Sequence, residues 1–223
     1  MISDQFSSAM RTRVKICGFT RAEDAVVAAR FGVDAIGLVF YPPSPRHVSI
    51  DQAISIVDAL PAFVTIVALF VDEQPAKIQE VLASVPVDCL QFHGDEAPDE
   101  CRLYGKRYIK AIRMKDGIDL ATVASRYHDA AGLLLDAYHP DAQGGTGHCF
   151  DWTKAQGQLP MPIILAGGLD VSNVNMALST VQPYALDVSS GVEITKGVKD
   201  ATKMAAFLAK VNQFAQDAHV RKL

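Results

Sequence analysis

Residues 14–40, VKICGFTRAEDAVVAARFGVDAIGLVF, hold one complete structural unit and decide the class of fold. The unit starts with an apolar, β-rich run at 14–17 and ends with a second such run at 35–40. Between them, residues 21–31 place small apolar side chains three and four positions apart, which is typical of one face of a helix. Thr20 is the expected N-cap of that helix. The pattern therefore predicts a strand, a helix and a second strand.

The same alternation continues along the rest of the chain. Several of the β-rich runs are nearly continuous in apolar residues, as parallel strands covered on both faces are. These further runs fall at 63–70, 89–92, 108–112, 132–136, 162–166 and 185–188. Helical patterns fall between and after them, at 50–60, 75–84, 97–104, 120–127, 172–180 and 201–218.

Eight strands that recur about every 24 residues, with helices between them, predict an α/β protein with a single (β/α)8 TIM barrel. The alternative is a doubly wound open sheet, which usually has about five or six strands. We expect one domain over residues 1–223, with residues 1–10 as a flexible N-terminal extension. A chain that is 49% hydrophobic and 21% charged has enough apolar material for a large core.

Charge and hydropathy exclude several other classes of protein. A net charge of −4 without a basic stripe argues against nucleic acid as a partner. A membrane-spanning helix needs roughly 20 apolar residues, but the longest apolar run, 63–71, is short and interrupted by Thr65. No secretory signal is visible at the N-terminus. We expect a cytoplasmic protein without a zinc site or disulfide framework, because its cysteines lie far apart and form no CxxC pair: Cys17, Cys89, Cys101 and Cys149.

The end of the first strand carries the first candidate functional residue. Active sites of such barrels lie at the C-terminal ends of the strands and in the loops that follow. The strand ends with KICG at residues 15–18, and because side chains alternate, Lys15 and Cys17 are expected to point into the barrel. A lysine beside Cys17 favours a reactive thiolate. The alternative interpretation is a small, buried core cysteine.

A second candidate is Arg46, in the loop after the second strand. Residues 41–46 read YPPSPR, and their prolines hold the loop extended and stiff. A single arginine on a stiff loop suits a preorganised clamp for a carboxylate or a phosphate. The alternative is a solvated surface arginine.

His93 and Asp136 follow the fourth and sixth strands. A histidine at a strand end is able to titrate or to donate to a substrate, whereas the alternative is a hydrogen-bonded structural histidine. Asp136 ends the run LLLD, which places its carboxyl group at the edge of an apolar wall. Partial burial there would favour the neutral form and allow Asp136 to act as a general acid. The alternative is an N-cap or loop carboxylate.

Glycine-rich and serine-rich turns come after the last strands. Such turns allow backbone N–H groups to approach an anion, and they match the phosphate site that barrels build after strands 7 and 8. The alternative is that they are tight turns only. No cluster of His, Asp and Glu has the spacing of a metal site, so a metal-free acid–base reaction on a phosphorylated small molecule is favoured. The residues concerned are Gly145, Gly167, Gly168, Ser189, Ser190 and Gly191.

Taken together, these segments closely resemble the phosphoribosylanthranilate isomerase family of tryptophan biosynthesis. The first and last matching motifs, VKICGFT and DVSSGVE, are specific in combination, and the second is followed by G-x-KD. The matches run in the order of the family and cover residues 13 to about 214, at 14–20, 34–49, 90–96, 133–137, 144–147, 150–152, 165–169, 187–193 and 197–200.

The resemblance implies an Amadori-type isomerisation of N-(5-phosphoribosyl)anthranilate. It makes Asp136 the general acid, Cys17 the general base and Arg46 the partner of the anthranilate carboxylate. His93 and Asp187 would line the pocket without an assigned step. Because the reaction is redox-neutral, neither a nicotinamide nor a flavin cofactor is expected. Backbone amides that would hold the phosphate lie around Gly145, Gly168, Ser190 and Gly191.

Two other functions remain open from the sequence. A related sugar-phosphate isomerase of histidine biosynthesis would use two aspartates as acid and base, and Cys17 stands where one of them would be. A non-catalytic barrel that binds a phosphorylated ligand is the second alternative, because fold alone does not imply catalysis. The expected partner is a small molecule, and no obligate protein partner is predicted.

Overall fold

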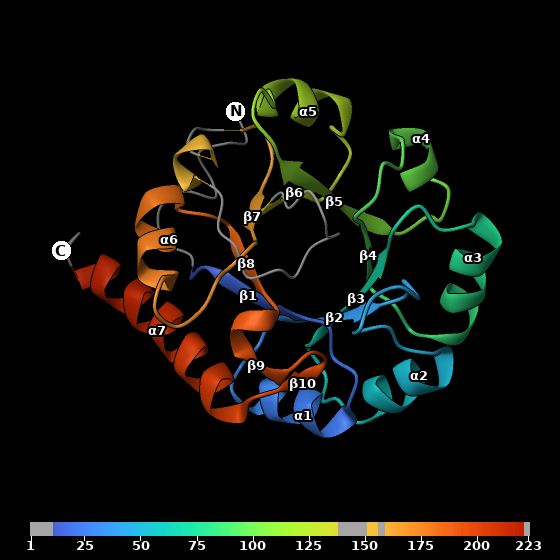
Figure 1. The fold of residues 1–223 in the computed structure, drawn as a ribbon, viewed down its shortest axis with the longest axis horizontal. Helices are drawn as coiled ribbons and strands as arrows, with labels where there is room; N and C mark the ends of the chain where they lie inside the picture. The colour runs from blue at the N-terminus through green and yellow to red at the C-terminus, as the bar shows by residue number, and fades with distance from the viewer. Residues whose placement is uncertain (1–10, 138–150, 156–158, 221–223) are drawn as a thin grey trace.

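The structure is a computed structural model, which describes residues 11–137, 151–155 and 159–220 (Figure 1). Eight parallel strands form a closed barrel in chain order, and the first strand pairs with the last. This closure confirms the predicted (β/α)8 barrel and excludes the doubly wound sheet. The strands are β1 (Arg13–Cys17), β2 (Ala35–Val39), β3 (Thr65–Phe70), β4 (Cys89–Phe92), β5 (Arg107–Met114), β6 (Gly132–Ala137), β7 (Ile163–Leu165) and β8 (Ala185–Val188).

Helices surround the ring of strands (Figure 1). They are α1 (Ala22–Arg30), α2 (Ile50–Asp58), α3 (Pro75–Ser84), α4 (Pro98–Cys101), α5 (Leu120–Arg126), α6 (Val174–Val181) and α7 (Ala201–Val220). Between β6 and β7, the described residues form a short 3-10 helix, η2 (Trp152–Ala155). After β8, a second 3-10 helix, η3 (Ser190–Val192), leads into a small antiparallel hairpin of β9 (Glu193–Thr195) and β10 (Val198–Lys199). None of the helices among the described residues has the length and apolarity to cross a membrane.

The N-caps of α2 and α1 are formed differently. Ser49 caps α2, because its hydroxyl accepts the backbone N–H of Gln52 at 3.2 Å. The prediction that Thr20 caps α1 is wrong. Arg21 occupies the N-cap position, and the Thr20 hydroxyl donates instead to the carbonyl of Gly197 at 2.6 Å. Thr20 therefore links the loop after β1 to the β9–β10 hairpin.

The third strand is shorter than its apolar run suggests. It begins at Thr65, whereas the sequence pattern starts at Phe63. Phe63 has a φ of 72° and its side chain is fully exposed. This left-handed conformation is strained for a bulky residue and belongs to the turn that precedes the strand.

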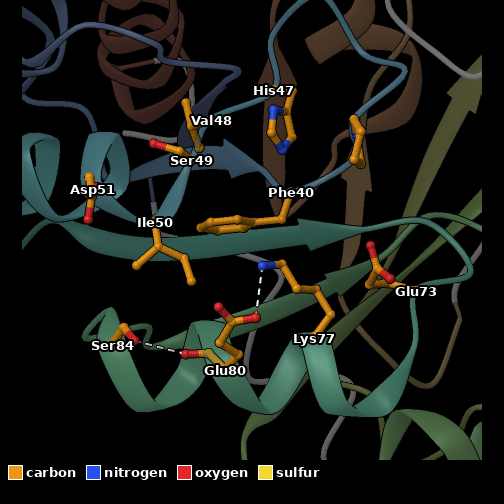
Figure 2. Close-up of a pocket in the computed structure, with 11 residues that line it drawn as sticks. Phe40, His47, Val48, Ser49, Ile50, Asp51, Glu73, Lys77, Glu80 and Ser84 are labelled. Carbon is orange, nitrogen blue, oxygen red and sulfur yellow. Dashed lines mark hydrogen bonds and ion pairs between the residues drawn. The ribbon is translucent and has the colours of Figure 1, made fainter.

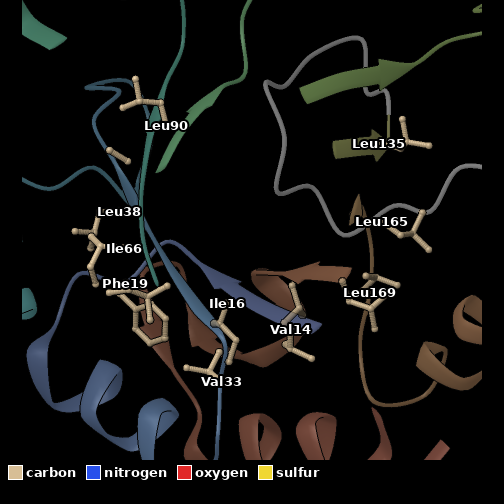
Figure 3. Packing of buried hydrophobic residues seen from close by; sticks show 14 of the residues in the cluster. Val14, Ile16, Phe19, Val33, Leu38, Ile66, Leu90, Leu135, Leu165 and Leu169 are labelled. Carbon is tan, nitrogen blue, oxygen red and sulfur yellow. The ribbon is translucent and has the colours of Figure 1, made fainter. Parts of the chain in front are cut away.

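Alternation along the strands creates two separate apolar layers. Leu133 and Leu135 point outward, into the large core between the strands and the helices. Figure 3 shows Leu135 among the residues of this core. Leu134 points inward and packs in the centre of the barrel with residues from other strands. A side-chain period of two places Asp136 on the same inward face as Leu134. The barrel interior is therefore apolar in its middle, and chemistry-bearing side chains of Asp136 and its neighbours lie toward its mouth.

Candidate active site

β1 delivers Lys15 and Cys17 to the inside of the barrel, as predicted. Val14 and Ile16 belong to the outer core, whereas Cys17 is buried at the mouth. The Lys15 ammonium donates to both carboxylate oxygens of Asp187 on the neighbouring strand β8, at 3.0 and 2.9 Å. Burial is the largest single effect on the pKa of Lys15 and lowers it, but the charges and hydrogen bonds of Asp187 and Cys17 together outweigh burial and raise this pKa.

The space beside Cys17 is filled closely from β2. A Cβ atom at Gly37 would lie 2.7 Å from Cys17 Sγ and 3.1 Å from Lys15 Nζ. Only glycine fits at this position without moving either group. The thiol and the ammonium therefore occupy a defined place at the mouth of the barrel.

Burial raises the pKa of Cys17 above its ordinary value, although the charge of Lys15 acts in the opposite direction. Lys15 favours the thiolate, as expected, because its charge and hydrogen bond lower the pKa of Cys17. Burial of the thiol is the larger effect, so the pKa of Cys17 is raised overall. A raised pKa favours the protonated thiol of Cys17 at neutral pH.

This protonation state predicts the pH dependence of Cys17 alkylation. Only the thiolate reacts, so the rate with iodoacetamide should keep rising through pH 9 without reaching a plateau below it. Peptide mass spectrometry after timed exposure measures the rate. Cys89 and Cys101 are internal controls in the same sample, because burial raises their pKa values to about 11 and about 12. A plateau near neutral pH would instead mean that Lys15 outweighs burial.

Asp136 lies inside the barrel with His93 beside it. The Asp136 carboxyl group is buried, and its Oδ2 lies 3.2 Å from His93 Nε2. The other ring nitrogen, Nδ1, lies 3.1 Å from the amide nitrogen of buried Gln91. His93 therefore bridges Gln91 and Asp136, with one ring nitrogen facing each side chain. His93 is thus a hydrogen-bonded histidine that also contacts the predicted acid.

Asp187 lies between the two sides of the site. It is paired with Lys15, next to Cys17, and it also interacts electrostatically with Asp136 and His93. The predicted acid and the predicted base come from β6 and β1, which β7 and β8 separate in the barrel. Asp187 is therefore bonded to Lys15 and interacts electrostatically with Asp136 and His93 on the other side of the site.

Arg46 reaches back over the end of β1. Its side chain is buried rather than solvated, and a Cβ atom at Gly18 would lie 2.4 Å from Arg46 Cδ. Gly18 also has a φ of 81°, so glycine is required there for two reasons. The side chain of Arg46 therefore packs against Gly18, the residue that follows Cys17.

The turns after β7 and β8 are packed against each other. A Cβ atom at Gly191 would lie 2.0 Å from the carbonyl oxygen of Leu169, so the two backbones meet without room for a side chain. Gly167 and Gly168 have φ values of 82° and 65°. Ser190 and Gly191 open η3, and the hydroxyl of Ser189 donates to the carbonyl of Cys17 at 2.9 Å. Gly145 and the rest of 144–147 lie outside the described residues.

Sequence reasoning did not assign a role to Glu193 or Lys199, although both fall in the matching motifs. Both oxygens of Glu193 accept from Arg46, and Lys199 donates to the same carboxylate at 2.8 Å. Burial opposes the charge of Glu193, but its two cationic neighbours outweigh burial and lower its pKa. Their positions in the matching motifs at 187–193 and 197–200 were the signal that could have pointed to them.

A separate surface groove of about 570 Å³ lies between the loop after β2, the start of α2 and helix α3. Figure 2 shows Phe40 and Ile50 on one side of it and Lys77, paired with Glu80, on the other. None of the predicted site residues lines this groove. Within the described part of the chain, no group of three or more His, Cys, Asp or Glu residues is placed to hold a metal ion.

A closed barrel whose mouth gathers a buried carboxyl, a buried thiol and a buried arginine defines a (β/α)8-barrel enzyme of the acid–base kind. The family model for N-(5'-phosphoribosyl)anthranilate (PRA) isomerase matches residues 14–210. The chain belongs to this family.

Individual relatives agree with the family model. An N-(5'-phosphoribosyl)anthranilate isomerase of Nitrosococcus oceani is 57% identical over 203 residues, covering 91% of this chain and 98% of the relative. One of Azotobacter vinelandii is 56% identical over 199 residues, covering 89% and 97%. The crystal structure of phosphoribosyl anthranilate isomerase from Thermus thermophilus has a TM-score of 0.83 and 34% identity, covering 91% of this chain and 99% of that one. An isomerase in complex with reduced 1-(o-carboxyphenylamino)-1-deoxyribulose 5-phosphate has a TM-score of 0.79 and 36% identity, with the same coverage.

Proposed function

We propose that this chain converts N-(5'-phosphoribosyl)anthranilate into 1-(2-carboxyphenylamino)-1-deoxyribulose 5-phosphate by general acid–base catalysis. The observation that carries the proposal is the placement of Asp136 and Cys17, both buried, on separated strands at one barrel mouth. An aldose-to-ketose rearrangement needs a proton donated on one side of the sugar and removed on the other. Two groups that face a ligand from different strands meet this requirement.

Asp136 is the proposed acid. Its carboxyl proton is transferred to the ring oxygen of the ribose, and the bond between that oxygen and C1 breaks as the nitrogen lone pair forms the C1–N double bond. The product of this step is an open-chain Schiff base with a new hydroxyl group. His93, at 3.2 Å from Asp136, orients the carboxyl group. The apolar wall formed by Leu134 keeps the site poor in water.

Cys17 is the proposed base. Its thiolate, formed when the thiol loses its proton to solvent, removes the proton from C2. The electrons of that C–H bond form the C1–C2 double bond, and the electrons of the C1–N double bond return to the nitrogen to give a neutral enolamine. The enolamine then takes a proton at C1 and loses one from the C2 hydroxyl to give the ketone. In one turnover a proton leaves Asp136 and one arrives at Cys17, and the return of a proton from Cys17 to Asp136 through solvent restores both groups. Lys15 stabilises the thiolate while it exists, because its charge lowers the pKa of Cys17 against the larger effect of burial.

The remaining groups bind the two ends of the substrate. Arg46 would hold the anthranilate carboxylate. The backbone amides of Gly168, Ser190 and Gly191, with Gly145 outside the described residues, would hold the phosphate. The packed turns after β7 and β8 support this arrangement, because they bring the last two strand ends of the barrel together. We also propose that the chain is a single domain, that it acts in the cytoplasm and that its partner is a small-molecule substrate.

The direct test is turnover of substrate generated in situ. Anthranilate-type fluorescence of phosphoribosylanthranilate should decay faster after addition of the purified protein than by spontaneous hydrolysis alone. If the protein binds inorganic phosphate but does not accelerate the decay, the isomerase function is refuted. A non-catalytic barrel that binds phosphorylated ligands would then be the better interpretation. If the protein instead isomerises only a ribotide of histidine biosynthesis, it would be the related sugar-phosphate isomerase of that pathway.

Replacing Arg46 with alanine should lower kcat/KM about 10- to 100-fold, chiefly through KM, because a charge-assisted pair to the substrate carboxylate is lost. Glu193 keeps Lys199 as a partner in this variant, so the fold should be retained. Steady-state kinetics measure the effect. Arg102→Ala is the control, because Arg102 forms ion pairs on the surface with Asp99 and Asp129. Unchanged KM and kcat/KM in Arg46→Ala would refute the clamp.

A further inference from the structure

Glu193 holds one edge of the Arg46 guanidinium. Arg46 Nε donates to Glu193 Oε1 at 2.8 Å, and Arg46 Nη2 donates to Oε2 at 2.7 Å. Both side chains are at least nine-tenths buried. A guanidinium group has five N–H donors in one plane, and this side-on contact uses two of them. The remaining parallel pair, one N–H on each η nitrogen, has the geometry that binds a second carboxylate.

Glu193 is itself fixed by the hairpin that follows β8. Glu193 and Lys199 are cross-strand neighbours in β9 and β10. Glu193 Oε1 accepts from Lys199 Nζ at 2.8 Å and from the backbone N–H of Gly197 at 3.2 Å. Thr20 holds the same turn through the Gly197 carbonyl. The carboxylate therefore has little freedom to rotate, and its position sets the plane of Arg46.

Lys199 faces the protein rather than the mouth. Its Nζ donates to the Cys17 carbonyl at 2.6 Å and to Glu193, and it lies 3.4 Å from the Ser189 carbonyl. Three oxygen acceptors around one nitrogen match an ammonium, which has three donors. Lys199 thus ties the strand end that carries Cys17 to the turn after β8. Among the described residues, Arg46 is the cation of this cluster that has N–H groups left for a ligand.

Arg46 and Lys199 are two cations that share the single carboxylate of Glu193, and the nearby buried Asp24 accepts from the backbone N–H of Lys199 rather than from either cationic group. A buried charge without a partner is unfavourable, and an anionic group on a ligand would balance it. The geometry and the charge therefore point to the same ligand group, a carboxylate that meets the free edge of Arg46.

We propose that Glu193 is a specificity-determining positioning residue, which turns the free edge of Arg46 toward the carboxylate of the substrate. Glu193 does not touch the substrate in this proposal. It selects N-aryl ribosylamine phosphates that carry a carboxylate over those that lack one. The inference rests on the proposed function, because it takes Arg46 as the group that binds the anthranilate carboxylate.

The test compares two ligands that differ only in that carboxylate. One is reduced 1-(o-carboxyphenylamino)-1-deoxyribulose 5-phosphate, and the other is the same reduced compound without the carboxyl group. Titration calorimetry gives the ratio of their affinities. The unaltered protein should prefer the carboxylated ligand at least about tenfold. Glu193→Gln should reduce this ratio to below about threefold, with the affinity for the other ligand and for inorganic phosphate retained.

Glu193→Asp keeps the charge but shortens the side chain, so it is the second variant if Glu193→Gln fails to fold. It should also lose most of the preference, because the shorter carboxylate cannot meet both Arg46 and Lys199. Asp34→Asn is the matched control. Asp34 also accepts two bonds from one arginine, Arg11, but at the start of β2, and its loss should leave the ratio unchanged.

The possible results distinguish a failure of the proposed role of Glu193 from a failure of the proposed role of Arg46. A folded Glu193→Gln or Glu193→Asp variant with the full preference for the carboxylated ligand would overturn the role of Glu193. Equal affinity of the unaltered protein for both ligands would instead overturn the role of Arg46, and with it this inference. A lower affinity of the variants for both ligands alike would show a general structural role for Glu193 and contradict the proposal.

Discussion

Replacing Asp136 with asparagine should lower kcat about 10²- to 10⁴-fold, the range expected when a general acid is removed. Asparagine has nearly the same shape, but its amide cannot transfer a proton to the ring oxygen of the sugar. Ring opening is the first covalent step in the proposed mechanism, and it would then depend on water. The measurement is the fluorescence decay of substrate generated in situ, with spontaneous hydrolysis subtracted.

The control for Asp136→Asn is ligand binding. The reduced product analogue should bind the variant within about threefold of the unaltered protein, because Arg46 and the turns after β7 and β8 are untouched. Thermal unfolding should show a folded protein, since an amide at position 136 is still able to hydrogen-bond with His93. Turnover within about tenfold of the unaltered protein would remove Asp136 as the acid.

The inward position of Asp136 could be predicted because strands have a strict period of two. In the run LLLD, the outward positions of Leu133 and Leu135 require that Leu134 and Asp136 face the barrel interior, as the structure confirms. The same rule correctly placed Lys15 and Cys17 inside. Eight such runs with helices between them were enough to predict the closed barrel.

Contacts between distant parts of the chain decided where the predictions were wrong. Thr20 has the side chain of an N-cap, but it bonds to Gly197, which a local pattern cannot reveal. Phe63 extends an apolar run, yet a turn with a positive φ separates it from β3. Threonine is a common N-cap and phenylalanine is common in strands, so both predictions followed the usual tendency of the residue type. Contacts and turns set by the whole fold outweighed those tendencies.

The same limitation applies to the charges of the site. Arg46 and Glu193 are 147 positions apart, so no spacing rule pairs them, although each falls in a matching motif. The pKa of Cys17 could not be predicted from Lys15 alone, because the larger effect is burial of the thiol at the barrel mouth. A neighbouring charge can be expected from the sequence, whereas the extent of desolvation depends on how the strands close.

Replacing Cys17 with alanine should lower kcat at least about 10²-fold with little change in fold, because alanine cannot accept the C2 proton. Cys17 packs in a small apolar cluster with Val39, Leu69 and Val71, which alanine also tolerates. Cys17→Asp should be more active than Cys17→Ala, because a carboxylate beside Lys15 is also able to act as a base. The measurement is again the decay of substrate fluorescence, made on variants whose thermal unfolding is normal.

The activities of Cys17→Ala and Cys17→Asp together would show whether Cys17 acts as a base or only has a structural role. A structural role predicts that Cys17→Ala, which preserves packing, is active, and that Cys17→Asp, which buries a second carboxylate near Asp187, is not. The proposed base predicts the reverse order. Near-normal turnover in Cys17→Ala would show that Cys17 is not the base. The paired side chains of Lys15 and Asp187 would then be the remaining titratable groups on this side of the site. The order of the two variants, rather than the loss in either one, therefore decides which group removes the C2 proton.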